Sequence, residues 1–244
     1  MIGMIKANLY RMFKNYLFII GLILAAVITY LAVSVDFEEM ISSWSGLKRM
    51  IFVSPATIVF YSFFTGIFIG NEYSQGAIRN KIIAGHSQIQ IYVSDYIALV
   101  IGLVAMLFMW FIGGLVAGVS IEKKLIIYLI IAIFYNSAYI SIMMAIAFRI
   151  KSIVKSIIAS IAVFYLTTNG LLIMNFIVSN STGVLLKITR IFYNFNGIGQ
   201  SFIHVGLMDG EINPGNGVQI LLSLILAVVA YIAGTMELNN RDLK

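Results

Sequence analysis

Few side chains in this sequence could do chemistry, and most of the candidates gather in one polar stretch, residues 70–95. The stretch carries two acidic residues, two basic residues and a histidine, and the second acidic residue, Asp95, ends it. Long apolar segments flank it on both sides. It is the longest run in the first half of the chain that is too polar to lie in the bilayer core. Because it can still form a helix, it is a place where a partner outside the membrane could bind.

Groups typical of enzymes are scarce. There is no cysteine, which excludes a disulfide framework, a thiolate metal site and a cysteine nucleophile. The two histidines, His86 and His204, fall on predicted opposite sides of the membrane, so we expect no metal site and no Ser-His-Asp triad. Neither G-x-x-x-x-G-K-[ST] nor G-x-G-x-x-G after a strand is present. We therefore predict that the chain is not an enzyme and holds no cofactor, and that another chain binds any ATP and Mg²⁺.

Asp95 is predicted to lie about one turn inside the third apolar segment. A carboxylate at membrane depth is costly and is a functional candidate by default. At this shallow depth it could pair with a cation near the inner surface: Lys81, Arg149, Lys151 or Lys155. A structural ion pair is the first interpretation, and a gating or coupling role and a proton relay are the alternatives.

Uncharged polar side chains within the apolar segments form a third group of candidates. Tyr128, Tyr135 and Tyr139 share one face of the fourth segment by helical spacing, and Asn169 lies in the fifth. Hydrogen bonding between helices, worth about 0.6 to 2 kcal/mol per bond in membranes, is the preferred interpretation for any single residue. The functional alternative is a mildly polar lining for the translocation of an amphipathic cargo. Asn169-Gly170 is also a predicted break in the fifth helix.

Composition places these candidates in a polytopic membrane protein. Of the residues, 61% are hydrophobic and 11% are charged, against about 25% charged in an ordinary soluble domain. Six segments are long enough to cross a bilayer core of about 30 Å: 16–35, 51–70, 92–118, 125–148, 153–178 and 218–234. We expect an all-α fold in which residues 1–244 form a single transmembrane domain with six transmembrane helices.

Shorter elements flank these segments. Residues 1–15 are predicted to form an amphipathic helix that lies at the membrane interface, with an ordinary basic flank as the alternative. Between the fifth and sixth segments, residues 184–193 and 197–208 are two apolar runs too short to span. Such runs suit re-entrant or interfacial helices. A seventh span is the less favoured alternative.

The distribution of Lys and Arg between the two sides of the membrane predicts the orientation of a membrane protein, because cytoplasmic loops carry the excess. With the N-terminus inside, the inner segments hold 10 of the 16 Lys and Arg residues and three of the acidic residues, whereas the outer segments hold six of each. The outer acidic residues are Asp36, Glu38, Glu39, Glu122, Asp209 and Glu211. Both termini are therefore predicted to be cytoplasmic. The formal charge of +6 follows from this topology, and we expect no nucleic-acid partner.

Helix-ending and helix-starting residues divide the polar stretch, residues 70–95, into two helical parts. Residues 72–84 are predicted to form an amphipathic helix on the cytoplasmic side. Gly85 is suited to end that helix, because glycine readily takes the left-handed conformation. Ser87-Gln88-Ile89-Gln90 then matches a capping box that starts the next helix. The stretch is thus predicted to be a short helix, a glycine stop and a capped restart.

The same run resembles the first cytoplasmic segment of type-2 ATP-binding-cassette exporter permeases from Gram-positive bacteria. That pattern has an acidic residue, then glycine, a small residue and an aliphatic-Arg-Asn-Lys run, then glycine and an aromatic residue at the restart. Here these are Glu72, Gly76, Ala77, Ile78-Arg79-Asn80-Lys81, Gly85 and Tyr92. The departures are mild: the family often has threonine at the place of Ala77 and a basic residue near His86. The N-terminal helix, the six spans and the two short runs before the last span also resemble the family.

The resemblance implies a role that the residues alone do not. The cytoplasmic helix would be the coupling helix that sits in a groove on a separate ATPase subunit. Its coupling residues would be Glu72, Tyr73, Gln75, Gly76, Arg79, Asn80 and Lys81. Two permease chains, identical or related, and two ATPase subunits would form an exporter in the bacterial cell membrane.

The resemblance leaves the cargo to be predicted from the apolar, aromatic-rich spans. We expect an amphipathic or hydrophobic peptide, such as a toxin or an antimicrobial, exported for secretion or for self-protection. Lipid, lipid-linked sugar and small drug are alternative cargoes. An integral membrane enzyme and a non-transporting membrane anchor or sensor are the alternatives from other functional classes.

Overall fold

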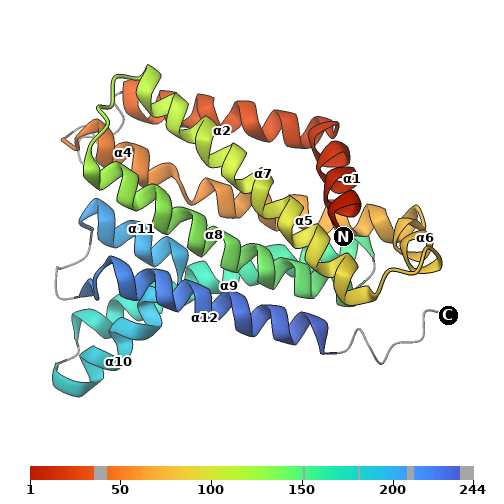
Figure 1. Ribbon diagram of the computed structural model, residues 1–244. Helices are drawn as coiled ribbons and strands as arrows, with labels where there is room; N and C mark the ends of the chain where they lie inside the picture. The colour runs from red at the N-terminus through yellow and green to blue at the C-terminus, as the bar shows by residue number, and fades with distance from the viewer. Residues whose placement is uncertain (36–42, 151, 181, 208–211, 237–244) are drawn as a thin grey trace.

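Long apolar helices dominate the structure (Figure 1). The computed structural model describes residues 1–35, 43–150, 152–180, 182–207 and 212–236. Within them, six helical segments are long and apolar enough to cross a membrane. They are α2 (Tyr16–Ser34), α4 (Gly46–Val53) continued by α5 (Ala56–Ser74), α7 (Gln88–Val116), α8 (Lys123–Ile150), α9 (Ile153–Ser179) and α12 (Asn216–Thr235). The six apolar segments predicted from the sequence are confirmed as helices long and apolar enough to span a membrane, with shifts of a few residues at most ends.

The shorter helices lie at the two ends of the bundle. α1 (Ile2–Phe13) and α6 (Ala77–Ile83) lie at one end, and α4, α10 (Gly183–Asn194) and α11 (Gly197–Val205) lie at the other (Figure 1). α10 and α11 correspond to the two short apolar runs noted in the sequence. The bundle therefore has short helices at both of its ends, joined by the long apolar helices.

α8 lies in the middle of the bundle and packs against α5, α7, α9 and α12. α2 packs along α7, and α9 packs along α5. α2 and α9 are the least enclosed spans, since only 17% and 11% of their most apolar windows are buried. Large apolar side chains such as Ile23 and Phe176 are exposed on them. Apolar surface of this kind suits contact with lipid or with a second membrane chain.

The second span consists of two helices because Pro55 interrupts it. Proline has no amide hydrogen to donate to a preceding turn, so α4 ends at Val53 and α5 begins at Ala56. The side chain of Ser54 turns back to donate to the carbonyl of Ile51 over 2.8 Å. The break therefore places a buried hydroxyl group within the membrane-spanning part of the bundle.

Two local predictions are wrong. Residues 72–84 do not form one helix: α5 continues through Glu72 to Ser74, and Gly76, with φ of 69°, separates it from a seven-residue α6. The reason is that the buried Glu72 side chain is held by Arg11 and Lys81, which keeps its backbone in the span. The predicted break at Asn169-Gly170 is also wrong, because α9 is continuous there and the Asn169 side chain donates to the carbonyl of Tyr165 in the same helix.

The predicted stop and restart of the polar stretch are confirmed. Gly85 has φ of 88°, directly after the end of α6. The Ser87 hydroxyl accepts from the backbone N–H of Gln90 over 3.2 Å, and the side-chain oxygen of Gln90 accepts from the backbone N–H of Ser87 over 3.2 Å. These reciprocal bonds satisfy backbone donors at the start of α7.

Part of the sequence on which the predicted orientation depends is outside the described residues. The acidic residues Asp36, Glu38, Glu39, Asp209 and Glu211 and the C-terminal segment 237–244 fall there. The cytoplasmic placement of both termini stays a prediction.

The contact between α2 and α7 offers a test of the packing. A Cβ at Gly113 would collide with the carbonyl oxygen of Ala26, and backbone cannot give way as a flexible side chain can. We expect Gly113→Ala to destabilise the protein by about 1 to 3 kcal/mol, because the two helices must separate. The midpoint of thermal unfolding in detergent measures this effect.

Gly170→Ala is the matched control, because a Cβ at that helical glycine meets nothing within 4 Å. It should be neutral or stabilising, since alanine is favoured over glycine in a helix by about 1 kcal/mol. Equal losses in the two variants would contradict the close approach of α2 and α7.

Candidate functional site

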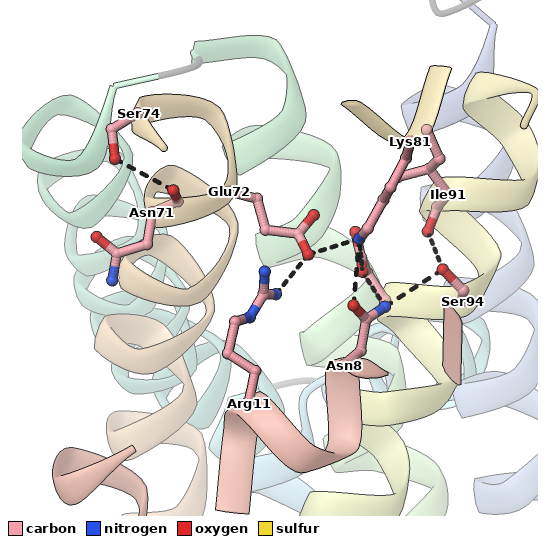
Figure 2. Close-up of polar contacts among 9 residues, drawn as sticks. Asn8, Arg11, Asn71, Glu72, Ser74, Lys81, Ile91 and Ser94 are labelled. Carbon is pink, nitrogen blue, oxygen red and sulfur yellow. Dashed lines mark hydrogen bonds and ion pairs between the residues drawn. The ribbon is translucent and has the colours of Figure 1, made fainter. Parts of the chain in front are cut away.

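Four charged side chains and one amide meet below the surface at the end of the bundle that holds α1 and α6. Asn8 and Arg11 come from α1, Glu72 from α5, Lys81 from α6 and Asp95 from α7. In Figure 2, the side chains of Asn8, Arg11, Glu72 and Lys81 point toward one another. We call these five residues the charge cluster. It joins α1 to three helices, α5, α6 and α7, that follow one another later in the chain.

Lys81 is the centre of the charge cluster. Its Nζ lies 2.6 Å from Glu72 Oε1, 3.3 Å from Asp95 Oδ1 and 3.1 Å from Asn8 Oδ1. An ammonium group has three donors, and each has a partner here on a different helix. One side chain of the short α6 thus connects it to α5, α7 and α1.

Asn8 and Arg11 complete the charge cluster from the side of α1. Asn8 Nδ2 donates to Asp95 Oδ1 over 2.5 Å and to Ser94 Oγ over 3.3 Å. Arg11 Nη2 lies 2.5 Å from Glu72 Oε1, and its guanidinium carbon lies 4.3 Å from the centre of the Phe68 ring. Because residues three apart share a helix face, α1 presents both polar side chains to the bundle at once.

Burial makes these contacts obligatory. Glu72 and Asp95 are 0% exposed, and two cations, Arg11 and Lys81, lie within ion-pair distance of them. Among the described residues, the second oxygens of both carboxylates, Glu72 Oε2 and Asp95 Oδ2, have no hydrogen-bond partner. Removing a cation would leave a buried charge without compensation, which costs far more than losing an exposed ion pair.

The sequence around α6 explains why Lys81 points inward. Gly76 and Gly85 both have positive φ and let the chain turn sharply at each end of the helix. Ile78 is buried, and Lys81, three residues later, lies on the same face toward the bundle. The opposite face of α6 is exposed, with Ile83 at 75% exposure.

The seven predicted coupling residues do not share one surface. Glu72 and Lys81 belong to the charge cluster. Tyr73 is half-buried and donates its hydroxyl hydrogen to the carbonyl of Phe148 over 3.2 Å. Gly76 is the turn before α6. The side chains of Gln75, Arg79 and Asn80 are exposed.

Asp95 pairs with Lys81 among the four cations that the sequence offered. Arg149 donates instead to the carbonyl of Ala233 over 2.8 Å, and Lys155 is exposed on α9. Lys151 is outside the described residues. The carboxylate is therefore tied to α6 and α1.

The candidate lining residues of α8 are buried within the chain. Tyr128 and Tyr135 form a hydroxyl cluster with Ser54 at the Pro55 break and with Ser201 of α11. The hydroxyl oxygens of Tyr128 and Ser201 are 2.8 Å apart, and those of Tyr128 and Tyr135 are 3.2 Å apart. These bonds attach α11 to α8 and to the second span.

The other two candidates of this group lie apart from the hydroxyl cluster. Tyr139 donates its hydroxyl hydrogen to Asn196 Oδ1 over 3.3 Å, and Asn169 is half-buried on α9. A role for any of the four in translocation stays a prediction.

Sequence reasoning missed Asn8 and Arg11 as members of the site. A signal was present: Asn8 lies four residues from both Met4 and Met12, which are buried, so an amide interrupts the face that α1 turns to the bundle. A buried amide needs hydrogen-bond partners, and Asp95 and Lys81 supply them.

The charge cluster is suited to holding helices together and to passing movement between them. In the part of the chain that the structure describes, no three His, Asp or Glu side chains are placed to hold a metal ion. Comparison with family models and with curated proteins finds no match for this chain. Function must therefore be inferred from the site and from the resemblance of the polar stretch.

Replacing Lys81 tests the charge cluster. We expect Lys81→Met to destabilise the protein by about 3 kcal/mol, because it leaves Glu72 and Asp95 with one cation between them. Adding Asp95→Asn should recover most of that loss, since one buried negative charge is removed with the positive one. Unfolding by denaturant in detergent measures both changes.

Lys155→Met is the control, because Lys155 is exposed on α9. Its effect should stay within about 0.5 kcal/mol. A loss at Lys81→Met no larger than at Lys155→Met would show that the cluster does not hold α6.

His204 of α11 gives a pH dependence at the other end of the bundle. Burial lowers the pKa of His204, and Lys124 lowers it further, while a hydrogen bond with Gln219 at 2.9 Å partly opposes this. With the folded pKa below the ordinary value of about 6.5, the stability is fully present above pH 6.5 and is lost as pH falls toward the lowered pKa. Hydrogen exchange of α11 amides, corrected for its intrinsic pH dependence, should therefore show weaker protection at pH 5.5 than at pH 7.5.

His204→Gln removes the titrating group and should remove this loss of protection. If the variant lost protection in the same way as the natural protein, another group would be responsible.

Proposed function

We propose that the chain is the permease subunit of an ATP-driven exporter, in which a separate ATPase subunit acts on α6. In this proposal the chain lies in the bacterial cell membrane. α1 lies at the inner interface and α6 in the cytoplasm, and α10 and α11 are re-entrant or interfacial helices at the outer end. The resemblance of the polar stretch to type-2 ATP-binding-cassette exporters suggests the class, and the two faces of α6 support it.

The observation that carries the proposal is the division of α6 into an inner and an outer face. Ile78 and Lys81 fix the inner face to the bundle, while Arg79, Asn80 and Ile83 are exposed on the outer face. Arginine is enriched at protein–protein interfaces, and here it lies on an exposed helix face that also carries an apolar side chain. A helix held between two positive-φ glycines can present this face without distorting α5 or α7.

The charge cluster supplies the mechanical link that an exporter needs. A force on the outer face of α6 acts on Lys81, whose ammonium is bonded to side chains of α5, α7 and α1. Two of these helices are membrane spans, so displacement of α6 tends to move both of them together. ATP binding and hydrolysis would occur in the partner subunits, and this chain's residues would receive the movement and reorganise the spans.

The two sparsely buried spans suit a second permease chain. α2 and α9 expose long apolar faces, and a transport path between two copies would use one or both of them. Homodimer and heterodimer both fit this surface. The working assembly would contain two permease chains and two ATPase subunits.

An amphipathic or hydrophobic peptide is the proposed cargo. The accessible surfaces of the spans are apolar and aromatic, and no ion pair crosses between them at mid-depth in the described residues. Such surfaces favour cargo that partitions into a membrane. Transport assays that include lipid, lipid-linked sugar and small drugs beside peptides decide the cargo class.

Arg79→Ala tests the proposal at the outer face of α6. The tagged chain is purified from membranes of its own cells, and the ATP hydrolysis that co-purifies with it is measured. We expect the variant to weaken binding of the ATPase by about tenfold or more, because an exposed arginine at the centre of an interface is a typical hot spot. ATP-dependent uptake of labelled peptide into inside-out vesicles should fall with it.

Lys155→Ala removes an exposed cation near the same end without touching α6, and it should leave both activities unchanged. Glu72→Ala is not an equivalent test, because Glu72 is buried in the charge cluster and its loss would disturb the fold. Unchanged ATPase binding and transport in Arg79→Ala, or no co-purifying ATP hydrolysis with the natural chain, would contradict the proposal.

A further inference from the structure

We propose that a pocket between α1 and the end of α5 binds the phosphate headgroup of an anionic phospholipid from the surrounding bilayer. The pocket has a volume of about 330 Å³ and opens beside the turn between α1 and α2. Its lining includes the ring of Phe68 together with two cations, three amides and a phenol: Arg11, Lys14, Asn15, Asn71, Gln75 and Tyr10. It lies on a different side of α1 from the buried part of the charge cluster.

The charge of the pocket is complementary to a phosphate. Its charged lining residues, Arg11 and Lys14, are both basic. Glu72 already offsets much of the charge of Arg11, so Lys14 supplies most of the uncompensated positive potential. The Nζ of Lys14 lies 4.6 Å from the centre of the Tyr10 ring, which holds the ammonium group beside the opening.

The start of α2 adds to this potential. Asn15 is the N-cap of α2, and its Oδ1 accepts from the Leu17 amide over 2.9 Å. No acidic residue lies in the first turn of α2. The N-terminal end of a helix carries a partial positive charge and favours a bound anion. Asn15 and Lys14 both line the pocket, so the start of α2 lies beside the lysine.

The surroundings favour a lipid over a free anion. α2 continues from the pocket as an exposed apolar face, and Tyr16, Ile20 and Leu24 lie along it. A phospholipid with its phosphate in the pocket could lay its acyl chains on this face. Tyr10 and Tyr16 are both exposed at this level, and tyrosine is typical of the membrane–water interface. A free phosphate would leave the apolar face unused.

The size and the amides fit a small polyol headgroup. A pocket of about 330 Å³ is at the lower end of the range for small-molecule sites. The amides of Asn15, Asn71 and Gln75 can donate to and accept from hydroxyl groups. Phosphatidylglycerol, with one phosphate and a terminal glycerol, has this combination of charge and hydroxyl groups.

Arg11 connects the pocket to the charge cluster, because it lines the pocket and pairs with Glu72. A phosphate in the pocket would draw on the same guanidinium group that Glu72 uses. Occupancy by lipid therefore acts on the contact between α1 and α5. This inference concerns lipid binding and does not depend on the proposed exporter function.

Native mass spectrometry of the detergent-purified full chain, titrated with phosphatidylglycerol or phosphatidylcholine, tests the proposal. We expect tight binding of phosphatidylglycerol, and weaker binding of phosphatidylcholine because its positive choline group lies beside Lys14. Lys14→Gln should weaken phosphatidylglycerol binding by about fivefold, the effect of one basic residue near an anionic headgroup. Lys14→Arg should keep it.

Lys6→Gln is the matched control, because Lys6 is exposed on the same helix and is not part of the pocket. It should change binding by less than about twofold, since an exposed charge away from the pocket is screened. Gln75→Leu is a second pocket variant at an exposed position, and it should also weaken binding if Lys14→Gln fails to fold. ATP hydrolysis is not measured, so the outcome is independent of the exporter proposal.

Three results would overturn the inference. One is equal binding of phosphatidylglycerol and phosphatidylcholine. Another is an equal loss in Lys14→Gln and Lys6→Gln, which would indicate only general surface attraction. The third is displacement of the lipid by inorganic phosphate at millimolar concentration, which would assign the pocket to a free anion.

Discussion

Two carboxylates are buried at one end of this protein, and the arrangement of the helices around them follows from supplying both with polar partners. Glu72 and Asp95 are on different spans, and neither span supplies a cation to them. The positive charges come from Lys81 on the short α6 and from Arg11 on α1. A buried anion without such a partner would cost several kcal/mol. α1 and α6 are therefore part of the folded core at this end, although each is too short to be a stable helix by itself in water.

Sequence reasoning succeeded where the physical signal is local. The spans follow from runs of about 20 apolar residues, and the restart of α7 follows from Ser87 and Gln90, three residues apart. It failed where the deciding contact comes from far along the chain. Glu72 looked like the first residue of a polar helix, because its partners Arg11 and Lys81 cannot be identified from the residues beside it. Asn8 was missed for the same reason: its partner Asp95 is 87 residues away.

The two ends of the bundle use different polar chemistry. At the end that holds α11, Ser54, Tyr128, Tyr135 and Ser201 are joined by neutral hydroxyl groups. Neutral hydrogen bonds between helices are worth about 1 kcal/mol in a membrane and can be exchanged at modest cost. The contacts of the charge cluster are harder to break one at a time, because each carries a buried charge. Movement that keeps the charge cluster intact and rearranges the hydroxyl cluster is therefore the less costly kind for this fold.

The turn between α1 and α2 has a geometric consequence of its own. α1 ends at Phe13 and α2 begins at Tyr16, so Lys14 and Asn15 alone connect the two helices. A two-residue connection reaches no more than about 7 Å, and here it is also shortened by the cap that Asn15 forms. The end of α1 and the start of α2 are therefore held close together, and the two helices can change their relative orientation only at these two residues. Any tilt of α2 within the membrane must swing α1 across the surface, and an obstacle that stops α1 must also stop α2.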